Sequence, residues 1–107
     1  MKRYALSRQA DEDMVLLYMD GAQRFGERRA DAYHDGLETL FQTLADYPEM
    51  ARLRSEYEPP VRIQRHRSHI VIYDTSADGI LIVRVRHGHE DWQNDPHGTL
   101  NESVEDQ

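Results

Sequence analysis

The chain has 107 residues and a mass of 12.6 kDa, a length that suits one domain with one hydrophobic core. It contains no cysteine, which excludes disulfides, thiolate nucleophiles and cysteine-based zinc sites. No segment has the apolar core of a signal peptide or the roughly 20 apolar residues of a membrane span. The sequence therefore predicts a single-domain cytoplasmic protein without a membrane segment.

The formal net charge is −7, and it is unevenly distributed along the chain. Residues 1–51 carry six basic and ten acidic side chains, residues 52–87 carry seven and four, and residues 88–107 carry none and six. Binding to nucleic acid rests on lysine and arginine, so the overall charge disfavours nucleic acid as a direct partner. The middle segment is nevertheless cationic, between an acidic first half and an acidic C-terminal tail.

The first elements along the chain are a short strand at residues 3–6 and a helix that begins at Arg8. Ser7 is a good helix N-cap, and acidic residues follow it near the positive end of the helix. Gly26 is expected to end this helix near Arg24 or Phe25. The apolar face of the helix consists of Ala10, Met14, Leu17 and Gly21.

A second helix follows almost at once and is predicted to end before Pro48, because proline lacks the backbone N–H that a helix needs. With the first helix it forms an antiparallel hairpin. Its apolar stripe consists of Ala30, Tyr33, Leu37, Leu40, Phe41 and Leu44.

After Pro59 and Pro60 the hydrophobic period changes from helical to strand-like. Strands are predicted at residues 61–66 (VRIQRH), 69–73 (HIVIY) and 80–87 (ILIVRVRH), with tight turns at 66–69 (HRSH) and 77–79 (ADG). These strands form an antiparallel meander. Because the helices precede the meander, the predicted class is α+β, with the helical hairpin packed on one face of the sheet. We place the domain at residues 1–92 and expect the acidic tail, residues 93–107, to be mobile or ordered by a partner.

The last strand leads into the stretch ILIVRVRHGHEDW, residues 80–92. Side chains of a strand alternate between its two faces. The residues expected to face the helices are Leu81, Val83 and Val85. Those expected on the opposite, concave face are Ile80, Ile82, Arg84 and Arg86. Arg62 or Arg65 could join the two arginines there, so the alternation predicts a cationic surface for an anionic partner.

The end of this stretch allows several interpretations. His87 could act as a general base, but this chemistry needs a second positioned group, and an exposed histidine at the strand end is the simpler interpretation. His87, His89 and Glu90 could bind a metal, although the spacing fixes no complete ligand set. His34 is expected at a solvated helix position. Trp92 either covers the edge of the sheet or anchors another protein.

The chain resembles a ParE toxin of the RelE/ParE superfamily of type II toxin–antitoxin systems. The resemblance covers nearly everything from Tyr4 to Trp92. Most family proteins have an arginine or a similar residue between Gly88 and Glu90, where this chain has His89. The segments that carry the resemblance are YALSRQADEDM, FGERRADAY, LFQTLADYPEMARLR, VRIQRHRSHIVIYD and, most specifically, ILIVRVRHGHEDW.

The resemblance implies a RelE-like fold and a toxin that a cognate antitoxin neutralises in a hetero-oligomer. ParE relatives act on DNA gyrase, whereas the RelE branch cuts mRNA on the ribosome. RelE-like ribonucleases are strongly basic, but this chain is acidic and has Lys2 as its one lysine. We therefore favour a gyrase inhibitor over an enzyme. The alternatives are a ribosome-dependent mRNA endonuclease and a binding domain without toxicity.

The resemblance and the strand pattern together give two hypothetical contact sets. DNA is expected to be contacted only indirectly, through the antitoxin, and no catalytic residue, cofactor or metal is predicted. The candidate gyrase contacts are Arg84, Arg86, His87, His89, Glu90, Asp91 and Trp92. The candidate antitoxin contacts are Met14, Leu17, Tyr18, Tyr33, Leu37, Arg62 and Arg65. An acidic antitoxin segment would complement the cationic region, as an amphipathic helix in a groove and as an added strand.

Overall fold

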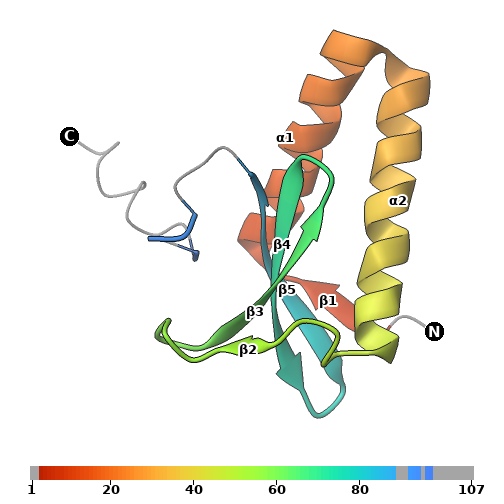
Figure 1. The fold of residues 1–107 in the computed structure, drawn as a ribbon. Coiled ribbons are helices and arrows are strands. Elements are labelled where there is room, and N and C mark those ends of the chain that lie inside the picture. The colour runs from red at the N-terminus through yellow and green to blue at the C-terminus, as the bar shows by residue number, and fades with distance from the viewer. Residues whose placement is uncertain (1–2, 89–91, 95, 98–107) are drawn as a thin grey trace.

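The computed structural model describes residues 3–88, 92–94 and 96–97, which form two helices and a five-stranded mixed sheet (Figure 1). The predicted α+β class and the order of its elements are confirmed. The structure adds a two-residue strand and lengthens the second strand of the meander to Ser76. The elements are β1 (Tyr4–Leu6), α1 (Arg8–Phe25), α2 (Glu27–Asp46), β2 (Leu53–Arg54), β3 (Val61–His66), β4 (His69–Ser76) and β5 (Gly79–His87).

The helical hairpin begins and ends where the capping residues predict. The Ser7 hydroxyl accepts a hydrogen bond from the Ala10 N–H at 3.0 Å, which caps α1. Gly26 has a φ of +93° and separates the two helices. Its N–H donates to the Ala22 carbonyl at 3.0 Å, and its carbonyl accepts from the Ala30 N–H at 3.1 Å. One glycine thus ends α1 and starts α2, in a backbone conformation that a side chain would disfavour.

The sheet has the strand order β1-β5-β4-β3-β2. The predicted meander of β3, β4 and β5 is antiparallel, and β1 pairs parallel to β5, with Tyr4 opposite Ile80. The predicted turn at residues 66–69 is also present, with Arg67 at a φ of +52°. Neither helix in the described part of the chain has the length and apolarity needed to cross a membrane.

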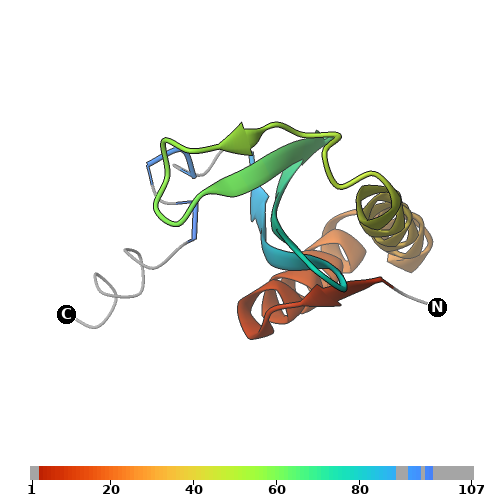
Figure 2. The ribbon, with the colours of Figure 1, turned by 90° about the horizontal axis from the view of Figure 1, so that it is seen from below.

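The helices lie along one side of the twisted sheet (Figure 2), where the larger core forms. A smaller cluster on the other side of the sheet contains Val61, Ile70, Ile72 and Trp92. The buried members of the larger core are Ala10, Met14, Leu37, Phe41, Leu44, Ala45, Ala51, Val71, Tyr73, Ile80, Ile82 and Val85. Most of the apolar stripe expected on each helix therefore faces the sheet, whereas Gly21 and Ala30 lie against each other between the two helices.

The expected facing of β5 is wrong for most of its apolar residues. Ile80 and Ile82 point into the larger core, whereas Leu81 is exposed and Val83 packs against the smaller cluster. The reason is a β-bulge. Ile82 pairs with Tyr73 and Arg84 with Ile72, so Val83 has no partner residue of its own and the alternation shifts there. Beyond the bulge, Val85 faces the helices as expected.

Candidate functional site

The free edge of β5 is covered by the first turns of α1. The Ser7 N–H donates to the Ile82 carbonyl at 2.9 Å, and the Ser7 hydroxyl donates to the Val83 carbonyl at 2.7 Å. Further along α1, an Asp13 carboxylate oxygen accepts the Val85 N–H at 3.0 Å. Backbone groups of β5 thus bind the N-cap residue Ser7 and the Asp13 side chain, which fixes the end of β5 against α1.

Arg84 is held by the same carboxylate. Its Nε donates to Asp13 Oδ2 at 2.7 Å and its Nη2 donates to Asp13 Oδ1 at 3.0 Å, the two-point geometry in which arginine and carboxylate bind best. The Arg84 Nη1 also donates to the His97 carbonyl at 3.1 Å. The Arg84 and Asp13 side chains are 15% and 14% exposed. Arg84 therefore joins three parts of the chain to one another.

The expectation that the arginines of β5 form an open cationic surface is also wrong. Arg86 is 2% exposed and lies beside Ile70 in the strand ladder, on the side of the smaller cluster. Trp92 is 7% exposed and belongs to that cluster. Of the two roles considered for Trp92, the structure supports the one in which it covers the sheet. Arg86 and Trp92 are therefore both withdrawn from solvent.

Of the other residues in the predicted target contact, the structure describes His87 alone. His89, Glu90 and Asp91 lie outside the described residues, so neither their contact role nor the metal site that would use His89 and Glu90 is tested. His87 is half-buried at the end of β5, and its ring centroid lies 5.0 Å from that of His69. His87 is thus the described member of the set that opens onto a cavity.

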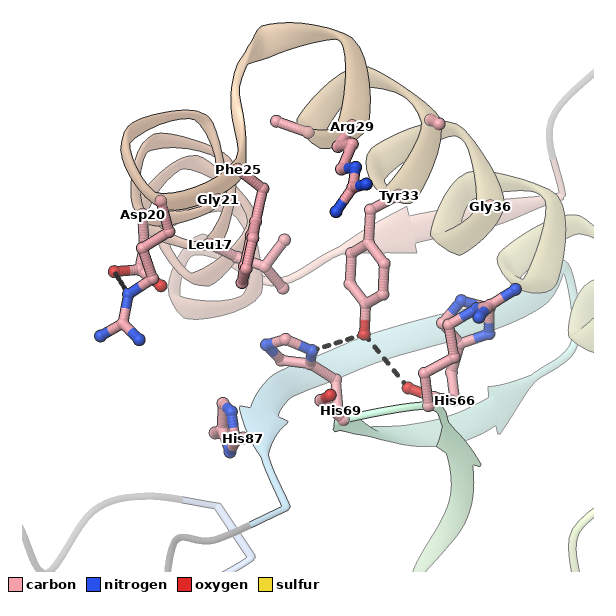
Figure 3. A pocket seen from close by; sticks show the side chains of 15 residues that line it. Leu17, Asp20, Gly21, Phe25, Arg29, Tyr33, Gly36, His66, His69 and His87 are labelled. Atoms are coloured by element: carbon pink, nitrogen blue, oxygen red, sulfur yellow. Dashed lines mark hydrogen bonds and ion pairs between the residues drawn. The ribbon is translucent and has the colours of Figure 1, made fainter.

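That cavity is a pocket of about 580 Å³ between the helical hairpin and the end of the sheet (Figure 3). It is assembled from α1, α2, the β3–β4 turn and the last residue of β5. Figure 3 shows the Tyr33 side chain pointing from α2 toward His69 and His66, with Phe25 and Leu17 on the side of α1. The lining residues are Leu17, Asp20, Gly21, Arg24, Phe25, Arg29, Ala30, Ala32, Tyr33, Gly36, His66, Arg67, Ser68, His69 and His87.

A hydrogen-bonded aromatic cluster forms the floor of this pocket. The Tyr33 hydroxyl donates to the His66 carbonyl at 3.3 Å. It also forms a hydrogen bond of 2.7 Å with His69 Nδ1, in which the tautomer of His69 decides the donor. The His66 ring meets the Tyr33 ring edge to face at 5.6 Å. Burial raises the pKa of Tyr33 and lowers the pKa of His66, and the nearby Arg67 charge lowers the His66 pKa further. Both shifts favour the neutral forms of these side chains.

The rim of the pocket is cationic, in contrast to the chain as a whole. Arg24, Arg29 and Arg67 line it, and Asp20 is the one acidic residue among the lining residues. Asp20 is bound to Arg24 Nε at 3.0 Å. Phe25, at the mouth, is 62% exposed. An apolar cavity with an exposed aromatic ring and surplus positive charge is suited to an anionic partner that also carries an apolar group.

The predicted antitoxin contacts do not form one surface. Met14 and Leu37 are buried in the larger core, because the helical period that singled them out is the period of the core-facing stripe. Leu17 and Tyr33 line the pocket. Tyr18 does not line that pocket and donates to Asp31 Oδ1 at 2.7 Å.

The two arginines of β3 in that set also separate. Arg62 donates from Nη1 to the Ala51 carbonyl at 2.7 Å, and its Nε is buried without a hydrogen-bond partner in the described part of the chain. Arg65 is exposed, with its guanidinium close to Gly88. Arg62 therefore secures the connection between α2 and β3, while Arg65 remains available at the surface.

Sequence reasoning missed most of the pocket. Phe25, Arg29, Arg67 and His69 come from segments up to 44 positions apart, and each alone looks like an ordinary surface or turn residue. The available signal was the run of basic and imidazole side chains in RHRSH. The helix packing that brings this turn against Tyr33 was not visible in that run.

Comparison with known proteins places this geometry in a family. Residues 4–92 match the family model described as the ParE toxin of the type II toxin–antitoxin system parDE. Toxin ParE1 of Caulobacter vibrioides is 30% identical over 87 residues, which are 81% of this chain and 90% of that protein. Toxin ParE3 of the same organism is 25% identical over 88 residues, 82% of this chain and 88% of that protein.

A solved structure agrees with the fold. It is titled as the chromosomal ParDE TA system from P. aeruginosa, has a TM-score of 0.69 and 17% sequence identity, and is matched over 81% of this chain and 96% of that one. At this identity the match speaks for the fold alone. The family match spans both helices, the whole sheet and the pocket between them. The chain therefore belongs to the ParE toxin family of type II toxin–antitoxin systems.

Proposed function

We propose that this ParE-type toxin inhibits DNA gyrase by direct protein binding, without catalysis, and that a cognate antitoxin neutralises it. The observation that carries the proposal is the family match, which extends over residues 4–92 and leaves none of the described elements outside it. The gyrase target comes from the family resemblance, and the binding mode comes from the site. The protein would act in the cytoplasm, where gyrase is found.

The pocket rim is the proposed target contact. His87 stays in the contact set predicted from the sequence, and Phe25, Arg29 and Arg67 join it because they surround the same cavity. Exposed arginine and aromatic side chains are the types that most often dominate protein interfaces. Arg84, Arg86 and Trp92 would act from within, since Arg84 binds Asp13 of α1, Arg86 is buried and Trp92 belongs to the smaller cluster.

A binding mode fits these residues better than RNA cleavage. A ribonuclease of the RelE kind needs cationic groups around a scissile phosphate beside a positioned general base. In this chain Arg84 is bound to Asp13 and Arg86 is buried, so neither arginine of β5 is placed for that work. A net charge of −7 also weakens attraction to ribosomal RNA.

The antitoxin would bind a second surface as well as the cationic rim. Val15, Leu16 and Met19 are apolar and exposed, and their spacing places them together on the outer face of α1. An acidic amphipathic segment suits both surfaces, with its apolar side chains on α1 and its carboxylates near Arg29 and Arg67. The resulting hetero-oligomer would reach operator DNA only through the antitoxin.

Two assays on the purified toxin test the proposal. In the first, gyrase supercoils relaxed plasmid in the presence of increasing toxin, with and without the antitoxin. We expect inhibition that the antitoxin abolishes. In the second, toxin is incubated with ribosomes and mRNA, and the mRNA ends are mapped by primer extension. Cuts on the ribosome without gyrase inhibition would overturn the proposal in favour of the nuclease. Inactivity in both assays would indicate a binding domain that has no toxicity.

A further inference from the structure

The outer face of α2 carries four side chains that are common metal ligands. Asp31, His34, Asp35 and Glu38 occupy positions i, i+3, i+4 and i+7, which is the spacing of one continuous face on a helix. The pattern D-x-x-H-D-x-x-E is thus presented as a single stripe. It lies away from the pocket, and none of its four residues lines that cavity.

Three of these side chains already converge. One ligand atom each from His34, Asp35 and Glu38 lies within 4.8 Å of the others, and His34 Nδ1 is 3.9 Å from Glu38 Oε1. Ligand atoms that share a tetrahedral zinc ion, with bonds of about 2.1 Å, lie roughly 3.4 Å apart. Side-chain rotation closes a difference of this size, because Asp35 is exposed and His34 and Glu38 are partly exposed.

The neighbouring helix supports the imidazole. The Tyr18 ring of α1 meets the His34 ring edge to face, with centroids 6.0 Å apart and planes at 89°. Tyr18 is itself fixed by its hydrogen bond to Asp31. Tyr18, Asp31, His34 and Asp35 line a hollow of about 380 Å³, so two of the three converging side chains border a concave surface.

The surroundings are electrically suited to a cation. Asp31, Asp35 and Glu38 place three acidic side chains on the same face of α2 as His34. An acidic face alone would attract any cation. The imidazole nitrogen is the feature that distinguishes between metals, since Mg²⁺ and Ca²⁺ prefer oxygen ligands whereas Zn²⁺ binds histidine nitrogen together with carboxylates.

We propose that His34, Asp35 and Glu38 form a binding site for a divalent transition-metal ion such as Zn²⁺, which they bind in preference to Mg²⁺ and Ca²⁺, with Asp31 held nearby by Tyr18. The site uses one imidazole and two carboxylates and leaves a coordination position for solvent. A metal there joins adjacent turns of α2. Because the ion binds the folded chain, it also raises the stability of the fold by mass action.

Calorimetric titration of the untagged, full-length protein with Zn²⁺, and separately with Mg²⁺, tests the site. Zn²⁺ should bind at least tenfold more tightly than Mg²⁺. His34→Gln and Glu38→Gln should each weaken Zn²⁺ binding at least tenfold, while Glu27→Gln, on the same helix, should leave it unchanged. Circular dichroism checks that the exposed substitutions preserve the helices.

Two results would overturn the assignment. If His34→Gln binds Zn²⁺ as tightly as the wild-type chain, the metal is held by other histidines. If Mg²⁺ binds as well as Zn²⁺, the stripe is only an acidic surface. Neither result bears on gyrase inhibition, which is measured without added zinc, so failure of this inference leaves the proposed function standing.

Discussion

Asp13 takes the place of a neighbouring strand at the edge of β5. Its carboxylate binds the Val85 N–H and two nitrogens of Arg84, all at 2.7–3.0 Å. Removal of this side chain would leave a largely buried guanidinium and a backbone N–H without their acceptor. Such orphaned groups cost more than the hydrogen bonds themselves contribute.

Asp13→Ala is therefore expected to lower the free energy of unfolding by about 3 kcal/mol, the scale for loss of one partner of a buried ion pair. Urea denaturation followed by circular dichroism measures the change. Glu12→Ala is the matched control, because Glu12 lies next in the helix and forms only an exposed pair with Arg8. The control should change stability by less than about 0.5 kcal/mol. Equal losses in the two variants would refute the role given to Asp13.

His66 makes stability depend on pH. Burial and the Arg67 charge hold the pKa of His66 below its ordinary value of 6.5 in the folded chain. The unfolded chain therefore binds a proton first as the pH falls, and the folded state loses stability from about pH 6.5 downward until His66 is also protonated in it. Above that range this residue contributes no pH dependence.

The urea midpoint of the wild-type chain is expected to fall more between pH 7.5 and pH 5.5 than that of His66→Gln. Arg67→Gln, which removes the second cause of the pKa shift, should give an intermediate fall. If His66→Gln lost stability as steeply as the wild-type chain over this pH range, another histidine would govern the response.

The elements differ in how much of them could be predicted from the sequence. The helices were predictable because their caps, Ser7 and Gly26, and their apolar period are local features. The facing of β5 was not, since Ile80 and Ile82 are as apolar as Leu81 and Val83, and the alternation alone does not choose between them. The bulge at Val83 arises from the pairing of β5 with β4 and cannot be seen in the sequence of β5 alone.

The outer face of α1 should bind the antitoxin without contributing to the core. Leu16 is 64% exposed, and Met19 lies beside it on the helix. Leu16→Glu and Met19→Glu are each expected to weaken antitoxin binding at least tenfold, because they add repulsion to an acidic partner and remove apolar contact. Calorimetry with the antitoxin measures the affinity.

Thermal unfolding of the same variants should match that of the wild-type chain. Gln42→Glu introduces the same charge at an exposed position of α2 and should bind the antitoxin normally. Unchanged affinity in both α1 variants would exclude this face from the antitoxin contact.

At the scale of the whole molecule, the fold separates two kinds of positive charge that looked alike in the sequence. The arginines of β5 are turned inward, where Arg84 joins β5 to α1. The cations that remain around a cavity, Arg29 and Arg67, belong to α2 and to the β3–β4 turn. The family and the fold could be inferred from the sequence, whereas the pocket could not, because it exists only when the hairpin packs on the sheet.

The most direct test of the central claim is gyrase supercoiling inhibition by three single variants, each with an intact circular dichroism spectrum. If the pocket rim contacts the target, Phe25→Ser and Arg67→Glu should each reduce inhibition at least tenfold. The first removes an aromatic anchor from the interface, and the second reverses the charge of an arginine in it. His87→Gln should keep near-normal inhibition, because glutamine retains hydrogen bonding but cannot transfer a proton near neutral pH. An inactive His87→Gln beside fully active Phe25→Ser and Arg67→Glu would contradict the contact mechanism and favour catalysis.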